Sequence, residues 1–338
     1  MYNVLGICLA LAALLIVNAL ASLLTAAFWR VVSRLTKGLS SATRARLIFI
    51  CRTFPATTAL LVVIFFFIPS YLVFEPNQTG ETVSIKLALL ALFSAVGIAL
   101  AVRRGIAAWL VTKRLVNDWQ NHSEIVLLEN SPIPAYRINH QFPVVAVIGV
   151  FRPKLFVAEQ IFNTLNNAEL AAVIEHETAH LTARDNLKHW LMRICRDVLA
   201  FIPFNHLLDK EWKEAIELAA DEKAASSRNG AFALDLAQAL IKIARLVPAG
   251  SKPTMPAGAF LIESESESGD ALARRIQRLA QFAESNFNVE KGGRERFSGG
   301  FLWICFILLF VAGTLAATNF DLLAATHAGI ERIVAFLS

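Results

Sequence analysis

Long runs of apolar residues constrain the fold of this chain more than any other feature. The first run, residues 4–29, contains no charged side chain and exceeds the roughly 20 helical residues that cross a hydrocarbon core. Three later runs are similarly apolar: 47–74, 87–110 and 301–318. Hydrophobic residues make up 56% of the 338 residues and charged residues only 17%, which excludes an ordinary soluble protein. We therefore expect a mainly α membrane protein with four transmembrane helices.

Basic residues predict how these spans are oriented. The loop after the first span carries basic residues and no acidic one: Arg30, Arg34, Lys37, Arg44 and Arg46. Short loops rich in Lys and Arg stay on the cytoplasmic side, so we expect both termini outside the bacterial cytoplasmic (inner) membrane and residues 113–300 in the cytoplasm. Contact with lipid headgroups explains this basic loop, so the net charge of +5 does not indicate direct nucleic-acid binding.

Other features of the spans have simple interpretations. The isolated Arg52 is expected to snorkel from the cytoplasmic end of its helix rather than to mark an ion path. A transporter is less supported, because the sequence shows no paired interrupted helices. The four cysteines form no C-x-x-C pair, which argues against a disulfide framework or a cysteine zinc site. A cleaved signal peptide is the less favoured interpretation of the first run, since residues 1–3 carry no basic side chain.

The segment 113–300 is long enough to bury a core of its own. Short β-rich pieces at 125–128 and 144–150, separated by Pro and Gly, predict a small sheet. The pattern after the sheet predicts helices within 167–247, a loop at 251–270, an amphipathic helix at 271–283, a polar linker at 284–300 and, beyond the fourth span, a short extracytoplasmic tail at 319–338. We therefore expect an α+β domain inserted between the third and fourth spans.

The sequence His176-Glu177-Thr178-Ala179-His180 lies in the first of these helices. Histidines at positions i and i+4 point about 40° apart on one helical face, so both imidazoles can bind the same zinc ion. Glu177 lies beside them, where it can act as the general base toward a water molecule whose pKa zinc lowers. The alternative is an exposed polar helix face. If the motif is functional, it predicts a zincin-like hydrolase with one Zn²⁺ per chain.

A third ligand has to come from further along the chain. Another motif class continues as H-x-x-G-x-x-H, with its third ligand at the last histidine, but the positions of that glycine and histidine hold Ala183 and Asn186 here. Glu217, in a second helix, would complete a His₂Glu site with an open fourth position. Asp221, on the same helical face, can accept the free ring N–H of a ligating histidine, and Asp185 is a second candidate for that role. The alternative role of Asp185 is to stabilise the turn after the first helix.

Further site residues are not distinguished by spacing alone. A donor to the oxyanion of the transition state can come from one of four side chains: His189, Arg184, Tyr136 or His206. An extended substrate can pair with the edge of the strand that contains Val147, Ile148, Gly149 and Val150. The alternative for this strand is a position within the core.

Three sequence blocks together carry a family resemblance. They are the motif at 176–180 followed by Arg184-Asp185-Asn186, then Glu217-Leu218-Ala219-Ala220-Asp221, then Arg274-Arg275-Ile276 before Arg278-Leu279. With three spans before the domain and one after it, the chain resembles the BlaR/MecR-type integral-membrane zinc metallopeptidases, which are gluzincins. HtpX and the CAAX prenyl proteases share the zinc motif and are second-choice relatives.

The resemblance implies a function in signal transduction. It implies a zinc metalloendopeptidase that cleaves a cytoplasmic repressor and also itself, with zinc held at the positions of His176, His180 and Glu217. Members that sense β-lactams carry a large sensor domain after the last span, whereas only residues 319–338 follow it here. We therefore do not expect direct β-lactam sensing, and we expect a separate sensor protein as a partner.

Two other functions compete with this one. In the first, zinc only stabilises a membrane scaffold that binds a partner; structural zinc sites usually have four protein ligands rich in Cys, so three ligands beside a base favour the enzyme. In the second, the chain is an HtpX-like protease for membrane-protein quality control. For the enzyme, we expect protein or peptide substrates near the membrane, including the linker 284–300, which tethering holds at an effective concentration on the order of millimolar.

Overall fold

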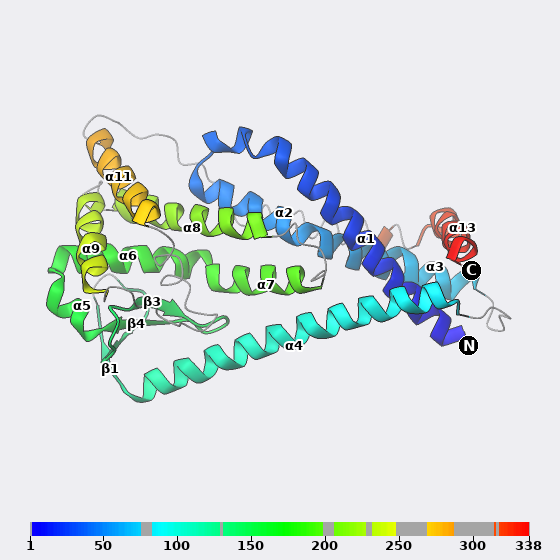
Figure 1. The fold of residues 1–338 in the computed structure, drawn as a ribbon, viewed down its shortest axis with the longest axis horizontal. Coiled ribbons are helices and arrows are strands. Elements are labelled where there is room, and N and C mark those ends of the chain that lie inside the picture. Colours follow the sequence, from blue (N-terminus) through cyan, green and yellow to red (C-terminus); the bar gives the residue numbers. More distant parts are fainter. Residues whose placement is uncertain are drawn as a thin grey trace.

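The structure is a computed structural model that describes residues 2–75, 83–128, 131–198, 206–227, 232–247, 269–286, 314–315 and 318–337. Within these ranges the protein is mainly helical, with one small sheet (Figure 1). The first elements are α1 (Tyr2–Val32), η1 (Leu35–Gly38), α2 (Ser41–Val62), the π-helical turn η2 (Val63–Phe67), α3 (Ile68–Phe74) and α4 (Ile85–Asn121). Four strands follow: β1 (Ser123–Val126), β2 (Ala135–Ile138), β3 (Val145–Ile148) and β4 (Lys154–Ala158). The later helices are α5 (Glu159–Thr164), α6 (Asn167–Ala183), α7 (Asp185–Asp197), α8 (His206–Ser226), α9 (Phe232–Leu246), α11 (Gly269–Asn286) and α13 (Phe320–Leu337).

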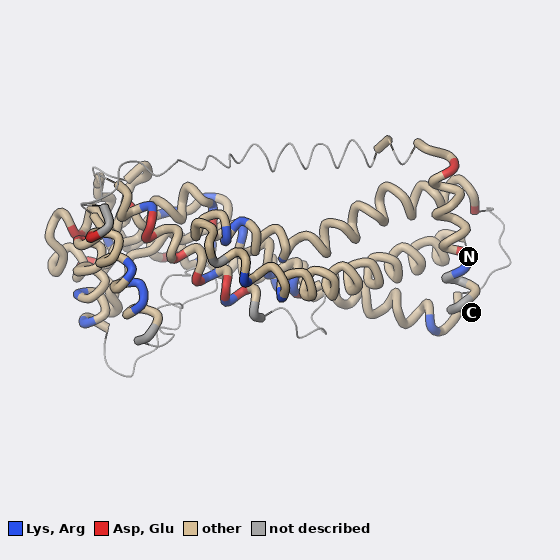
Figure 2. Tube along the Cα trace, turned by 90° about the horizontal axis from the view of Figure 1, so that it is seen from above, with Lys and Arg blue, Asp and Glu red and all other residues tan. Residues whose placement is uncertain are grey.

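Three helical segments are long and apolar enough to cross a membrane: Tyr2–Val32, Ser41–Phe74 and Ile85–Asn121. They match the first three predicted spans. Figure 2 shows that Lys, Arg, Asp and Glu gather around the sheet and its helices and again at the opposite tip, with a long, nearly uncharged stretch between. The predicted fourth span at 301–318 and the predicted linker at 284–300 lie almost entirely outside the described residues, as does the predicted loop at 251–270.

Helix α4 is longer than the sequence predicted. The apolar run ends at residue 110, but the helix continues to Asn121, so the expected domain boundary at residue 113 falls inside it. The extension is stable because Leu115, Val116 and Trp119 pack on the core around the sheet. One uninterrupted helix therefore leads from the third span into the domain.

Close backbone contacts hold α7 along α4. The indole Nε1 of Trp190 donates to the Gly105 carbonyl oxygen at 3.0 Å. At Gly97, an added Cβ would lie 2.6 Å from the Val198 carbonyl oxygen, so a residue without a side chain is required there. The two helices approach each other more closely than larger residues would permit.

The snorkelling interpretation of Arg52 is wrong. Its side chain is buried, and its Nε lies 3.3 Å from Oδ1 of Asp209 on α8. Arg196 on α7 contacts the other oxygen of Asp209 at 3.1 Å. The snorkelling argument considered the span alone, whereas α7 and α8 pack against α2 and bring a carboxylate to the arginine.

The sheet has the strand order β1-β2-β4-β3. The β1–β2 and β3–β4 pairs are antiparallel, whereas β2 and β4 run parallel. The sequence predicted the regions of β1 and β3 but did not separate β2 and β4 from the turns around them. Gly149 ends β3 with φ +123°, a conformation that favours glycine, and thereby turns the chain toward β4. Strand β3 forms an edge of the sheet and contacts α6.

Helix α6 starts where its capping residues require. The side chain of Asn166 accepts from the backbone N–H of Glu169 at 2.8 Å, and the Glu169 carboxylate accepts from the Asn166 N–H at 2.9 Å. This capping box satisfies two backbone donors at the helix start. Helix α6 packs on β3, α8 and α9, while the predicted amphipathic helix appears as α11 on α8 and α9. Histidines on α6 thereby face carboxylates on α8.

Candidate metal centre

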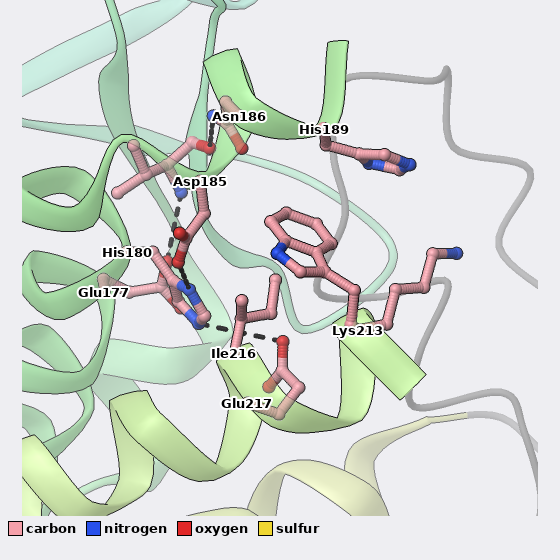
Figure 3. A pocket seen from close by; sticks show the side chains of 10 residues that line it. Glu177, His180, Asp185, Asn186, His189, Lys213, Ile216 and Glu217 are labelled. Atoms are coloured by element: carbon pink, nitrogen blue, oxygen red, sulfur yellow. Dashed lines mark hydrogen bonds and ion pairs between the residues drawn. The ribbon is translucent and has the colours of Figure 1, made fainter. Parts of the chain in front are cut away.

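Three side chains from α6 and α8 converge at one point. The Nε2 atoms of His176 and His180 lie 3.3 Å apart. Each Nε2 lies 3.7 Å from a carboxylate oxygen of Glu217. All three residues are buried, and they form a group whose atoms could hold a metal ion. Figure 3 shows His180 and Glu217 facing each other across the site.

The spacing of these atoms fits zinc. Tetrahedral ligands about 2.0–2.2 Å from zinc lie about 3.3–3.6 Å from one another. The two nitrogens, 3.3 Å apart, fall in this range, and each lies 3.7 Å from a different oxygen of Glu217; one ligand atom from each of the three residues can be chosen with all of them within 4.8 Å of one another. One oxygen of Glu217, Oε2, is buried and makes no hydrogen bond within the described residues, but Nη1 of Arg275 lies 3.2 Å from it as an ion-pair partner. The donor set of two imidazoles and one carboxylate suits a hydrolytic zinc site.

Each histidine has a carboxylate behind it. Nδ1 of His176 lies 3.0 Å from Oδ1 of Asp221, and Nδ1 of His180 lies 2.9 Å from Oδ2 of Asp185. At His180, an Nδ1–H bonded to Asp185 leaves Nε2 as the metal-binding atom and fixes the orientation of the ring. Asp221 lies close to His176, but Nδ1 of His176 makes no hydrogen bond within the described residues. The expected roles of the two aspartates stay predictions.

The buried acids also change the protonation of the histidines. Burial alone disfavours a charged imidazole, but hydrogen bonds to Asp221 and Glu217 outweigh it and raise the pKa of His176 to about 10. At His180, burial is likewise outweighed by Asp185 and Glu217, so its pKa is also raised. A metal ion must therefore displace protons from this site, which couples its binding to pH.

Glu177 lies next to the ligands, on the side facing the sheet. Its Oε2 accepts a hydrogen bond from the Val147 backbone N–H at 3.1 Å. Burial raises the pKa of Glu177 to about 7, despite the opposing effect of the two histidines. A small cavity of about 20 Å³, enough for about one water molecule, adjoins Glu177, His180 and Glu217. A carboxylate with a pKa near neutrality beside such a cavity can take up and release a proton.

The structure separates the four oxyanion candidates. His189 is buried and lines the cavity, where Lys213, Arg193 and Arg196 add to the effect of burial and lower its pKa to about 3. Arg184 is exposed at the left-handed turn between α6 and α7, with φ 55°. Tyr136 lies in the sheet core against Phe156. The side chain of His206 is outside the described residues. Among the three described candidates, only His189 lines the cavity.

The proposed edge strand lies beside the site, but its backbone is partly engaged. Val147 lines the cavity, and its carbonyl oxygen accepts from Nδ2 of Asn186 at 2.8 Å. The same nitrogen donates to the Gly149 carbonyl oxygen at 3.0 Å. The four residues of β3 are buried, so both readings of this strand, edge and core, describe part of its position. A substrate strand would have to replace Asn186 at this edge.

Sequence reasoning assigned no role to two residues of the site. Asn186 directly follows Asp185, and this adjacency was the available signal for it. Arg275, on α11, bonds both oxygens of Asp221 at 2.8 Å and lies 3.2 Å from Oε2 of Glu217. Its place in one of the sequence blocks that carry the family resemblance was the available signal, but only the fold reveals its partners.

Comparison with known proteins agrees with this geometry. The model of the BlaR1 peptidase M56 family matches residues 73–279, more than half of the chain. No curated protein matches the sequence. The matched region includes α4, the sheet, the histidine and glutamate group and Arg275. The chain belongs to the BlaR1 peptidase M56 family, which confirms the resemblance seen in its motifs.

Proposed function

We propose that this M56 family member is a membrane-bound zinc metalloendopeptidase. The observation that carries the proposal is the convergence of His176, His180 and Glu217 at zinc-like spacing, with Glu177 beside them. Family membership supports a peptidase, and the three apolar helices support a location in the membrane. We place the domain on the cytoplasmic side of the inner membrane and both termini outside, on the basis of the basic loop between α1 and α2.

The residues of the site have distinct roles in this mechanism. Bound zinc supplies a Lewis acid that polarises the scissile carbonyl and lowers the pKa of water. Glu177 takes the proton of the attacking water and later transfers it to the leaving amine. Asp221 and Asp185 hold the rings of His176 and His180 in the ligating tautomer. His189, which lines the cavity, is the candidate donor to the oxyanion.

The substrates we propose are proteins close to the membrane. Helix α4 leads without interruption into the domain, so the site stays near the bilayer. A cytoplasmic repressor and the chain's own linker at 284–300 are the specific candidates, with a separate sensor protein as the source of the signal. Mass spectrometry of zinc-loaded protein should detect new termini between 284 and 300; an intact linker in a confirmed active enzyme would leave only substrates cleaved in trans.

The proposal is tested by Glu177→Gln in purified full-length protein. We expect this variant to keep one zinc per chain but to lose hydrolysis of an unfolded protein substrate by several orders of magnitude, because only the base is removed. Glu175→Gln is the matched control: Glu175 is partly buried on α6, its carboxylate contacts Ser227 rather than the candidate ligands, and the variant should cleave like the wild type. Elemental analysis should show that Glu217→Ala loses zinc.

Two results would contradict the proposal. Cleavage by Glu177→Gln at the wild-type rate would remove Glu177 from the mechanism. Tight zinc binding by a wild-type protein that cleaves no substrate would favour the scaffold instead.

A further inference from the structure

We propose that Arg275 is a positioning residue of the metal centre, so that the centre is complete only when helix α11 is in place. This inference deepens the proposed function and rests on it for the identity of the metal. Arg275 reaches the site from a third helix, in addition to α6 and α8. It touches no predicted reacting atom, and it acts through Asp221 and Glu217.

The contacts of Arg275 are those of a planar fork between two acids. Its Nε and Nη2 donate to the two oxygens of Asp221, both at 2.8 Å, and its Nη1 lies 3.2 Å from Oε2 of Glu217. The arginine is only 8% exposed, and both acids are buried as well. Paired N–H donors of this kind fix the plane of a carboxylate as well as its charge. A lysine could supply the charge but not the plane.

Two of the oxygens that Arg275 contacts also lie near His176. Oδ1 of Asp221 accepts from Arg275 and lies 3.0 Å from Nδ1 of His176. Oε2 of Glu217 lies near Arg275 and 3.7 Å from Nε2 of His176. A shift of the guanidinium therefore displaces the acceptor behind His176 and a ligand atom in front of it together.

The charges of the two acids also require Arg275 between them. Glu217 and Asp221 are one helical turn apart on the same face of α8, and like charges at this spacing repel each other. The repulsion is strong here because both groups are buried. Arg275 lies between them as the counter-charge, 2.8 Å from each oxygen of Asp221 and 3.2 Å from Oε2 of Glu217. Without it, the two carboxylates would move apart, and the site would lose the position of a ligand or of the group that orients His176.

Packing explains how α11 carries this residue to the site. Leu279 of α11 is buried, and Leu272, Ile276 and Phe282 pack against the same core as the sheet, α6 and α9. Arg275 is on this inward face, whereas the adjacent Arg274 is exposed. The inward face of α11 thus carries apolar residues that pack on the core and one charged residue, Arg275. Displacement of the helix would move Arg275 away from both acids.

The test compares substitutions at the two neighbouring arginines in the full-length protein. Zinc affinity is measured by competition with a chelator, and thermal unfolding of the metal-free protein is measured in parallel. We expect Arg275→Gln to weaken zinc binding by about 10- to 100-fold, the usual effect of removing a group that supports metal ligands. Arg275→Lys should recover part of the affinity. Arg274→Gln should bind zinc like the wild type.

A double substitution separates positioning from general stability. If Arg275 acts through Asp221, the loss of zinc affinity in Arg275→Gln with Asp221→Asn should be smaller than the product of the two single losses. Peptidase assays should show lower kcat for Arg275→Lys at unchanged folding. Wild-type zinc affinity in both Arg275 variants would overturn the inference, and so would independent, multiplying effects in the double variant. Because zinc affinity is the primary measurement, failure of the proposed peptidase activity would be seen separately, in the wild type.

Discussion

Helix α8 meets a buried arginine near each end, and the two arginines are held very differently. Near its start, Arg52 from α2 makes one contact of 3.3 Å with Asp209, and its Nη2 has no hydrogen-bond partner in the described part of the chain. In its second half, Arg275 from α11 makes contacts of 2.8, 2.8 and 3.2 Å with two acids. The start of α8 thus makes one longer contact with its arginine. Its second half, called the metal end because it carries the candidate ligand Glu217, makes three shorter ones.

The difference indicates what each arginine does. A fork that fixes two acids suits a site whose ligand atoms must be placed within fractions of an ångström. A single longer contact suits a junction, where the charge links α2 to α8 without defining a geometry. At the junction two cations share one carboxylate, because Arg196 contacts Asp209 together with Arg52; Arg196 also pairs with Asp197 at 3.1 Å. The metal end has the opposite ratio, with one cation between two acids.

The largest stability effect that we expect comes from Asp209→Asn. This change leaves Arg52 buried without a carboxylate and should lower the free energy of unfolding by about 3–5 kcal/mol, the usual cost of breaking a buried ion pair. Thermal unfolding in detergent measures it. Arg52→Met should cost far less, because Asp209 keeps Arg196. An equal decrease in the free energy of unfolding for Asp209→Asn and Arg52→Met would contradict this expectation.

A smaller effect should come from Glu177→Gln in the metal-free protein. The pKa of Glu177 is raised from 4.5 to about 7, so the folded state holds this proton more tightly than the unfolded state. The resulting cost is absent below pH 4.5, grows as the pH rises, and reaches about 3 kcal/mol above pH 7. Glu177→Gln should therefore be more stable than the wild type at pH 8 and similar to it near pH 4.5. An unchanged difference between the two pH values would contradict the pKa argument.

The smallest effect concerns the membrane side, where α7 packs along α4. Gly97→Ala places a methyl group against the Val198 carbonyl oxygen and should cost about 1–3 kcal/mol, as overpacking usually does. Gly38→Ala is the matched control, because nothing lies within 4 Å of its added Cβ. Thermal unfolding of both variants in detergent measures the difference. Equal melting temperatures of the two variants would mean that α4 and α7 accommodate the added methyl group without loss of stability.

The sequence predicted those parts that depend on local spacing. The apolar runs predicted the three described spans, and the i, i+4 histidines predicted which side chains of α6 meet. Glu217 could be named because a carboxylate in a second helix would complete a His₂Glu site. Arg275 could not be assigned, since its partners are more than 50 residues away and only the packing of α11 brings them together. Arg52 was misjudged for the same reason, because its carboxylate comes from another helix.

The continuous α4 also connects the two ends of the protein physically. Its 37 residues form a rod of about 55 Å that contains no proline at which it could bend. A rod of this length acts as a lever: a tilt of about 5° at one end moves the other by about 5 Å. Helix α4 is hydrogen-bonded to α7 at Gly105. Helix α7 begins with Asp185, the partner of His180. The Ile85 end is therefore connected to the partner of His180 through two packed helices rather than through a flexible loop.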